Sequence, residues 1–256
     1  MLRQYNRDIP VKIYFINDFN KTTHPIVKSV EYGSFTKRTF LEIAEKLNAK
    51  IETVCPFDSS KFRKGLKNYF FCNRSCLTLE EDSVLHIDGD TFINGNVEEL
   101  FDKYQDVDVA VPISKFYIQS GFSCKENTPP FNAAVILFNN KLCKKWANEI
   151  ISYMNKTLDS KWFGGKNYPL EEISTNYWVC DNAKNIGYFE KSECYPVENN
   201  TDLLIPPKSI IIHTYVQQWP TLYKSLRTPL DNAIKIPTKP KMFRSKKTPP
   251  VEDRGS

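Results

Sequence analysis

The sequence predicts an α/β fold in a single domain, with a mostly parallel sheet flanked by helices. Two observations support this prediction. Short apolar runs rich in β-branched residues recur along the chain, and segments with the helical spacing of apolar residues separate them. Strands that alternate with helices in this way usually form parallel sheets that are buried on both faces. The chain has 256 residues, which is enough for one domain with a sizeable core.

The N-terminal half begins this alternation. Its apolar runs and helical periodicities predict, in order, a strand over 11–16 that ends in Asn17-Asp18, a helix over 34–47, a strand over 51–54 and a helix with a basic face over 58–71.

The C-terminal half continues the alternation with a strand over 83–87 that runs straight into Asp88-Gly89-Asp90. The elements predicted after it are a short helix over 97–101, strands over 107–111 and 133–138, a helix over 141–155, a loop over 159–170, a helix over 171–179 and a strand over 209–212 that ends at His213.

Charge divides the chain into a domain over 1–234 and a tail over 235–256. The tail holds seven basic residues, two acidic residues and four prolines, a composition typical of flexible segments. It therefore carries the whole net charge of +5, and the domain is formally neutral. A neutral domain argues against nucleic acid as a partner, because nucleic-acid-binding folds carry a basic face. The basic tail leaves open a weak contact with an anionic membrane surface.

The sequence also bears on the compartment. No apolar run approaches the roughly 20 residues that cross a bilayer, and the N-terminus lacks the core of a signal peptide. The prediction is a cytoplasmic protein, with the Golgi or ER lumen as the alternative for a protein separated from its membrane anchor. The seven cysteines are scattered without a CxxC pair, which predicts neither a zinc site nor a disulfide framework. Most of them are expected to be small buried side chains, as suits a reducing compartment.

Asp88 and Asp90 are the first candidate site residues. Residues two apart in an extended segment point the same way, so both carboxylates can face one ligand. Gly89 between them lets the backbone bend and lets a bulky ligand approach. Two carboxylates at the end of a buried strand repel each other unless a cation lies between them. A divalent ion such as Mg²⁺ or Mn²⁺, shared with phosphate oxygens, removes that repulsion.

Three predicted strands end in polar residues suited to a site. They are the strands followed by Asn17-Asp18, by Asp88-Gly89-Asp90 and by His213. Ligands of parallel α/β sheets bind beyond the carboxyl ends of the strands, so these side chains are expected to converge. The imidazole nitrogen of His213 favours Mn²⁺ over Mg²⁺. His86 lies within a strand and is interpreted as a core histidine.

Four segments resemble one family of enzymes. They are residues 84–102 (VLHIDGDTFINGNVEELFD), residues 131–139 (FNAAVILFN), Glu171-Glu172 through Asn176, and Ile211-Ile212-His213. In order and spacing they resemble GT-A fold glycosyltransferases that use nucleotide sugars, most closely glycosyltransferase family eight, the glycogenin and bacterial galactosyltransferase-like group. The resemblance implies the GT-A, Rossmann-like form of the α/β fold.

The resemblance also implies roles for individual residues. Asp88, Asp90 and His213 would bind the metal, Mn²⁺ or Mg²⁺. Asn17 and Asp18 would border the nucleotide of a donor that is UDP-linked by default, together with Asp88, Gly89 and Asp90. Asn132 would hydrogen-bond the donor sugar. The acceptor would be a hydroxyl of a glycan or glycoprotein. The reaction would retain the configuration at the anomeric carbon of the donor sugar.

The sequence departs from this family at two points. Ala134 replaces the glycine that is usual in this family, and no Lys-Pro-Trp follows His213. In the family, that lysine neutralises the charge of the diphosphate. Another basic side chain, Lys224 or one within 61–67, would have to do so here. An inverting enzyme would instead need a carboxylate base, which Glu171 or Glu172 could supply.

Three other functions are alternatives to a glycosyltransferase. A sugar-phosphate nucleotidyltransferase also uses paired aspartates and metal, but the region 17–25 lacks the glycine-rich phosphate loop of such enzymes. A binding module of the same fold without activity is disfavoured by the intact Asp88, Asp90 and His213. The two catalytic carboxylates of a glycoside hydrolase lie about 5–9 Å apart. A hydrolase is disfavoured here because Asp88 and Asp90 are nearly adjacent in the sequence.

Overall fold

A computed structural model of the protein describes residues 6, 8–16, 42, 44–54, 80–89, 91–157, 170–197 and 209–213. The described elements are, in chain order, β1 (Lys12–Ile16), β2 (Lys50–Val54), β3 (Val84–Ile87), β4 (Thr91–Ile93), α4 (Glu98–Lys103), β5 (Val109–Pro112), α5 (Lys115–Gln119), β6 (Val135–Phe138), α6 (Leu142–Thr157), α7 (Leu170–Asn182), β7 (Ile186–Phe189), β8 (Cys194–Pro196) and β9 (Ile211–His213).

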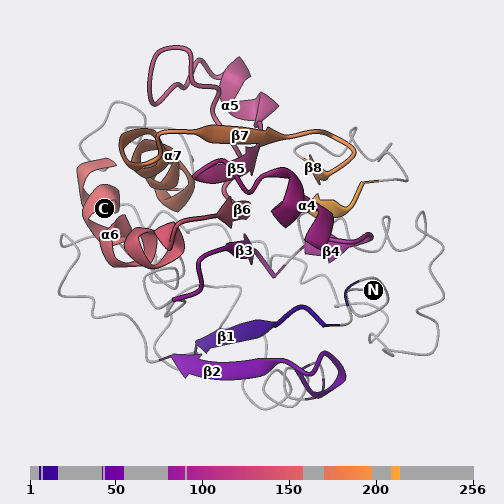
Figure 1. The fold of residues 1–256 in the computed structure, drawn as a ribbon. Helices are drawn as coiled ribbons and strands as arrows, with labels where there is room; N and C mark the ends of the chain where they lie inside the picture. The colour runs from indigo at the N-terminus through magenta and orange to yellow at the C-terminus, as the bar shows by residue number, and fades with distance from the viewer. Residues whose placement is uncertain are drawn as a thin grey trace, which may run out of the picture.

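The largest described sheet has the strand order β3-β6-β5-β7 (Figure 1). Strand β6 runs antiparallel to both of its neighbours, whereas β5 and β7 are parallel. Every residue of β5 and β6 is buried, as expected of central strands that are covered on both faces.

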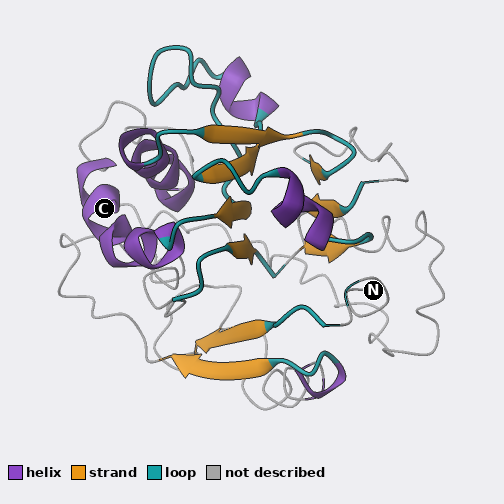
Figure 2. Ribbon diagram, in the orientation of Figure 1, coloured by secondary structure: helices purple, strands orange, loops and turns teal. Residues whose placement is uncertain are grey.

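Alternate side chains of these central strands enter two different cores. Val109, Val111, Ile136 and Phe138 pack against Trp146 and Ile150 of α6 and Trp178 of α7. Ala110, Val135 and Leu137 pack on the other face against Leu100 of α4, together with Ile93 of β4 and Ile211 of β9. The sheet is therefore the middle layer, with the pair α6 and α7 on one side (Figure 2).

A smaller sheet of order β4-β9-β8 lies on the α4 side of this core. Its central strand, β9, is antiparallel to β4 and parallel to β8. The strands β1 and β2 form a parallel pair with Lys12 opposite Lys50. No helix in the described part of the chain is long and apolar enough to span a membrane.

The α/β class, the single domain and the helices that flank its sheets are as predicted. Most predicted elements are present with shifts of a few residues at their ends. The strand pairing is more mixed than expected, because three of the described pairs are parallel and three antiparallel. The short elements β4, α5, β7 and β8 were not predicted, since three to five residues carry too little periodicity to show.

Several predictions fall outside the described residues. The helix over 34–47 is seen only at 42 and 44–46, which are helical. The helix over 58–71, nearly all of the loop over 159–170 and the tail over 235–256 remain predictions.

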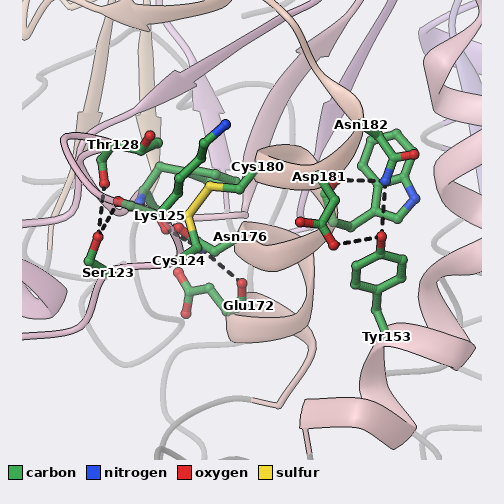
Figure 3. Close-up of a disulfide and its surroundings, with 12 residues drawn as sticks. Ser123, Cys124, Lys125, Thr128, Tyr153, Glu172, Asn176, Cys180, Asp181 and Asn182 are labelled. Carbon is green, nitrogen blue, oxygen red and sulfur yellow. Dashed lines mark hydrogen bonds between the residues drawn. A yellow bond between two sulfur atoms is a disulfide. The ribbon is translucent and has the colours of Figure 1, made fainter.

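The expectation that the cysteines form no disulfides was wrong. Cys124 and Cys180 form a disulfide across 56 residues of sequence (Figure 3), whereas Cys143 and Cys194 are free and buried as expected. The bond links the segment after α5 to the last turn of α7. Sequence spacing did not predict it, because the two cysteines meet only when this segment packs along the helix.

Candidate active site

Asp88 lies against the segment that precedes β6. The β3–β6 ladder pairs Ile87 with Val135, and the backbone N–H of Asp88 extends the ladder by donating to the carbonyl oxygen of Ala134 at 2.8 Å. Because the two strands are antiparallel, the residue that follows β3 and the residues that precede β6 meet at one edge of the sheet. Asp88 therefore lies beside the segment that contains Asn132, which stands at the amino end of its strand.

Asn132 is buried and shapes the turn into β6. Its Oδ1 accepts a hydrogen bond from the backbone N–H of Ala134 at 3.0 Å, and its own N–H donates to the carbonyl oxygen of Pro112 at 3.0 Å. These bonds fix the side chain, a local role that Asn commonly plays. They leave the two Nδ2 protons without an acceptor among the described residues, so the amide keeps donors for a ligand.

Two glutamates begin α7, where the positive end of the helix dipole favours carboxylates. Glu171 is buried, whereas Glu172 is partly exposed. The Oε1 atom of Glu172 accepts a hydrogen bond from the backbone N–H of Ala133 at 3.2 Å, and its Oε2 atom accepts one from the hydroxyl of Tyr117 at 2.6 Å. Glu172 therefore connects α5, α7 and the segment beside Asp88.

Asn176, one turn further along α7, binds the backbone of the segment that leads into β6. Its Oδ1 accepts from the backbone N–H of Phe131 at 3.0 Å, and its Nδ2 donates to the carbonyl oxygen of Phe131 at 2.9 Å. Glu172, Asn176 and Cys180 are spaced by four residues and thus lie on one face of the helix (Figure 3). Through these three side chains, α7 holds the chain between α5 and β6.

His86 contacts the first aspartate of the motif. Its Nε2 lies 3.2 Å from Oδ1 of Asp88, two residues further along the same face of the extended chain. Its ring also packs edge-on against Trp146 in the core, at a centroid distance of 5.3 Å. The histidine is partly buried and packs on the core, consistent with its interpretation from the sequence, and it also contacts Asp88.

Gly89 is exposed, and its φ lies outside the left-handed region. A Cβ at this position would meet none of the described atoms within 4 Å. The backbone at this position is therefore open to other residues, and the bend predicted from the sequence does not require a glycine. The open space beside Gly89 fits the second predicted reason, which is the close approach of a ligand.

His213 ends β9 and is buried. In the β4–β9 ladder it pairs with Thr91, the residue directly after Asp90 in the sequence. Thr91 Oγ1 is buried and has no hydrogen-bond partner among the described residues. The ladder thus brings the end of β9 to the same short stretch of chain that begins with Asp88.

Three of the predicted site residues cannot be placed. Asn17, Asp18 and Asp90 lie outside the described residues, as do Lys224 and residues 61–67. Within the described part of the chain, no group of three or more histidine, cysteine, aspartate or glutamate side chains forms a metal centre. Asp88 and His213 are the two predicted ligands that the structure places.

The sequence did not point to Tyr117 or Thr91, nor to the hydrogen bonds between Asn176 and the Phe131 backbone. Tyr117 falls between the predicted strands over 107–111 and 133–138, where the sequence predicted no helix or strand. The tyrosine is recognisable as part of the site only because its hydroxyl reaches Glu172, which is 55 residues away. No local pattern carries such a contact.

No protein-family model matches the sequence, and no curated protein matches it. Among solved structures, the chain is similar to an active-site mutant of LgtC, with 17% identity and a TM-score of 0.50 over 86% of this chain and 97% of that one. It is also similar to the galactosyltransferase LgtC in complex with donor and acceptor sugar analogues (15% identity, TM-score 0.49, 86% and 97%). Mouse xyloside xylosyltransferase 1 is a further match (11% identity, TM-score 0.47, 80% and 84%).

At these identities the likeness is one of fold. The match to the LgtC mutant extends over nearly the whole of that chain, so it concerns the domain as a unit. This protein therefore has the α/β fold of the GT-A glycosyltransferases.

Proposed function

We propose that the protein is a metal-dependent glycosyltransferase that moves a sugar from a nucleotide diphosphate sugar to a hydroxyl of a glycan or similar acceptor. A UDP-sugar is the favoured donor. The observation that carries the proposal is the hydrogen bond between Asp88 and Ala134. It sets the first aspartate of the motif against the segment that contains Asn132, so that one end of the site suits a diphosphate and the other a sugar.

The side chains fit a divalent cation by their chemistry. Asp88 and Asp90 would supply carboxylate oxygens and His213 an imidazole nitrogen, a mixed set that suits Mn²⁺. The pairing of Thr91 with His213 supports this set, because it links the motif to the histidine across one ladder. When bound, the metal would stabilise the negative charge that builds up on the diphosphate as the glycosidic bond breaks.

The chain's own residues would orient the donor. Asn132 would donate its two free Nδ2 protons to sugar hydroxyls, and His86 would keep the Asp88 carboxylate in one orientation through the 3.2 Å contact. Glu172 would hold the Ala133 backbone and so set the position of Asn132. Positioning of this kind lowers the barrier by placing the reacting groups before the reaction begins.

Retention of configuration is the stereochemical outcome that we propose. An inverting enzyme needs a carboxylate base that is free to take the acceptor proton. Both oxygens of Glu172 already accept hydrogen bonds within the protein, and Glu171 is buried. These observations favour a structural use of the two glutamates over their use as a base.

The disulfide bears on the compartment. Disulfides persist in oxidising compartments and are rare in the cytosol. The Cys124–Cys180 bond therefore favours the lumenal alternative over the cytoplasmic location.

A donor panel tests the proposal. The protein is incubated with UDP- and GDP-sugars, with and without Mn²⁺, and nucleotide release is measured. One donor should be consumed only with metal, and Asp88→Asn should lower the rate by roughly 100-fold or more. The matched control is Asp106→Asn, the same charge change at an exposed position before β5, which should leave the rate unchanged.

If no donor is hydrolysed or bound under any condition, the proposal is wrong. If a product forms, proton NMR of its anomeric centre decides between retention and inversion.

A further inference from the structure

Tyr117 points into the protein from a short helix whose neighbouring side chains point out. Helix α5 begins after Ser114, whose hydroxyl caps it by accepting the backbone N–H of Tyr117 at 3.3 Å. Phe116 and Ile118 are 47% and 51% exposed, whereas Tyr117 is 2% exposed. The cap and the burial together fix the direction of the tyrosine.

The ring of Tyr117 is held by a small apolar cluster with Phe122 and Ile173. The ring centroids of Tyr117 and Phe122 are 5.6 Å apart in an edge-on arrangement, and Phe122 packs in the same way on Tyr177 of α7 at 5.7 Å. The Cys124–Cys180 disulfide closes the far end of this contact. The whole segment from α5 to Cys124 is therefore fixed along α7, and the tyrosine hydroxyl has a defined position.

That hydroxyl donates to Oε2 of Glu172 at 2.6 Å, a short bond of the charge-assisted kind. The other oxygen of the same carboxylate accepts the backbone N–H of Ala133 at 3.2 Å. A carboxylate that is held at both oxygens cannot rotate, so the bond from Tyr117 controls where the bond to Ala133 lies. Ala133 sits between Asn132 and Ala134, the residue that pairs with Asp88.

We propose that Tyr117 is a positioning residue of the active site, which acts through the Glu172 carboxylate on the segment that carries Asn132. The inference rests on the proposed function, because it assigns the tyrosine to the sugar end of that site. It also makes a separate structural claim, that the Ala133 contact depends on the Tyr117 hydroxyl.

The first experiment removes the hydroxyl and keeps the ring. Tyr117→Phe should lower kcat by roughly 10- to 100-fold and change the KM of the donor less than about threefold, because the diphosphate end of the site is untouched. The control is Tyr177→Phe, which removes a hydroxyl from the same cluster and should leave kcat at the wild-type value. If the tyrosine hydroxyls of this cluster served only stability, both variants would lose stability. Tyr117→Phe would then show no selective loss of kcat relative to KM.

A double-mutant cycle tests whether the tyrosine acts through the glutamate. Glu172→Gln keeps the volume of the side chain and removes its charge. If Tyr117 works through Glu172, the double variant should be within about twofold of Glu172→Gln alone, since the second change removes a contact that is already weakened. Multiplied effects of the two changes would overturn the inference.

A third experiment does not need turnover. Amide hydrogen exchange is followed by NMR for Ala133 and Ala134 in the wild type and in Tyr117→Phe. The Ala133 amide should exchange at least about tenfold faster in the variant, while the Ala134 amide, bonded to Asn132, should change less. An unchanged Ala133 amide would overturn the inference whether or not the protein is active.

The two proposals therefore fail separately. A wild-type protein that uses no donor contradicts the proposed function, and the Ala133 exchange still decides the role of Tyr117. An active protein with unchanged kcat in Tyr117→Phe contradicts only the inference.

Discussion

Thr91 and His213 lie opposite each other in the β4–β9 ladder. The residue after the Asp88-Gly89-Asp90 motif is thereby fixed against the residue that ends β9, although 122 positions separate them in the sequence. Backbone hydrogen bonds, rather than a contact between loops, make this connection. The histidine side of the proposed metal site is therefore built on a rigid element.

His213→Ala should weaken Mn²⁺ binding by roughly 100-fold or more, because it removes the one nitrogen donor of the proposed set. The measurement is the free Mn²⁺ signal in electron paramagnetic resonance, which needs no substrate. Asp106→Asn is the control and should bind as the wild type does. Equal Mn²⁺ affinity in the wild type and His213→Ala would remove the histidine from the site.

Asn176→Ala should lower the free energy of unfolding by roughly 3 kcal/mol or more, because it leaves the N–H and the carbonyl of buried Phe131 without their partner. Urea denaturation followed by circular dichroism measures the change. Asn182→Ala, on the same helix, removes bonds that are only partly buried and should cost about 1 kcal/mol or less. Similar losses of stability in both variants would contradict the prediction that the buried Asn176–Phe131 hydrogen bonds contribute more than those of Asn182.

Loss of the disulfide should lower the free energy of unfolding by roughly 4 kcal/mol, because a loop of this length restricts the unfolded chain strongly. Cys124→Ala with Cys180→Ala tests this by urea denaturation under non-reducing conditions. Adding dithiothreitol should destabilise the wild type and leave the double variant unchanged. If the wild type gives no disulfide-linked peptide in mass spectrometry, the bond does not form in the protein.

Glu193 should make the fold sensitive to acid. Burial would raise the pKa of its carboxyl, but hydrogen bonds from Lys103, Tyr104 and the Glu190 backbone outweigh this and hold the pKa below its ordinary value of 4.5. A carboxyl with a depressed pKa in the folded state adds stability at neutral pH, and this stability is lost as the pH falls through that pKa.

The free energy of unfolding should therefore fall more steeply in the wild type than in Glu193→Gln between about pH 5 and about pH 3. Glu99→Gln changes an exposed glutamate on α4 and should keep the wild-type slope. Parallel curves for the wild type and Glu193→Gln would show that the contacts of Glu193 add nothing that depends on pH.

The Cys143 thiol should resist alkylation in the folded protein. It is 1% exposed, and burial raises its pKa to about 12, so little thiolate is present at pH 8. Labelling with iodoacetamide at pH 8, followed by peptide mapping, should modify Cys143 only after unfolding. Rapid labelling of the native protein at this residue would contradict the packing of α6.

Much of the fold was predictable because its signals are local. The apolar run before Asp88, the run over β6 and the periodicity of α6 each report a buried element from a few consecutive residues. The strand pairing was not local. The order β3-β6-β5-β7, with β6 antiparallel to both neighbours, arises from contacts between segments that are far apart in the sequence.

The candidate site shows the same division. The sequence by itself determined the residue types: the carboxylate pair with its glycine, the histidine at a strand end, and the asparagine before a strand. Only the tertiary structure decided that Asp88 faces Ala134, that Thr91 pairs with His213 and that Tyr117 reaches Glu172. The physical reason is that strand register and the meeting of distant side chains depend on how whole layers pack, which no stretch of consecutive residues encodes.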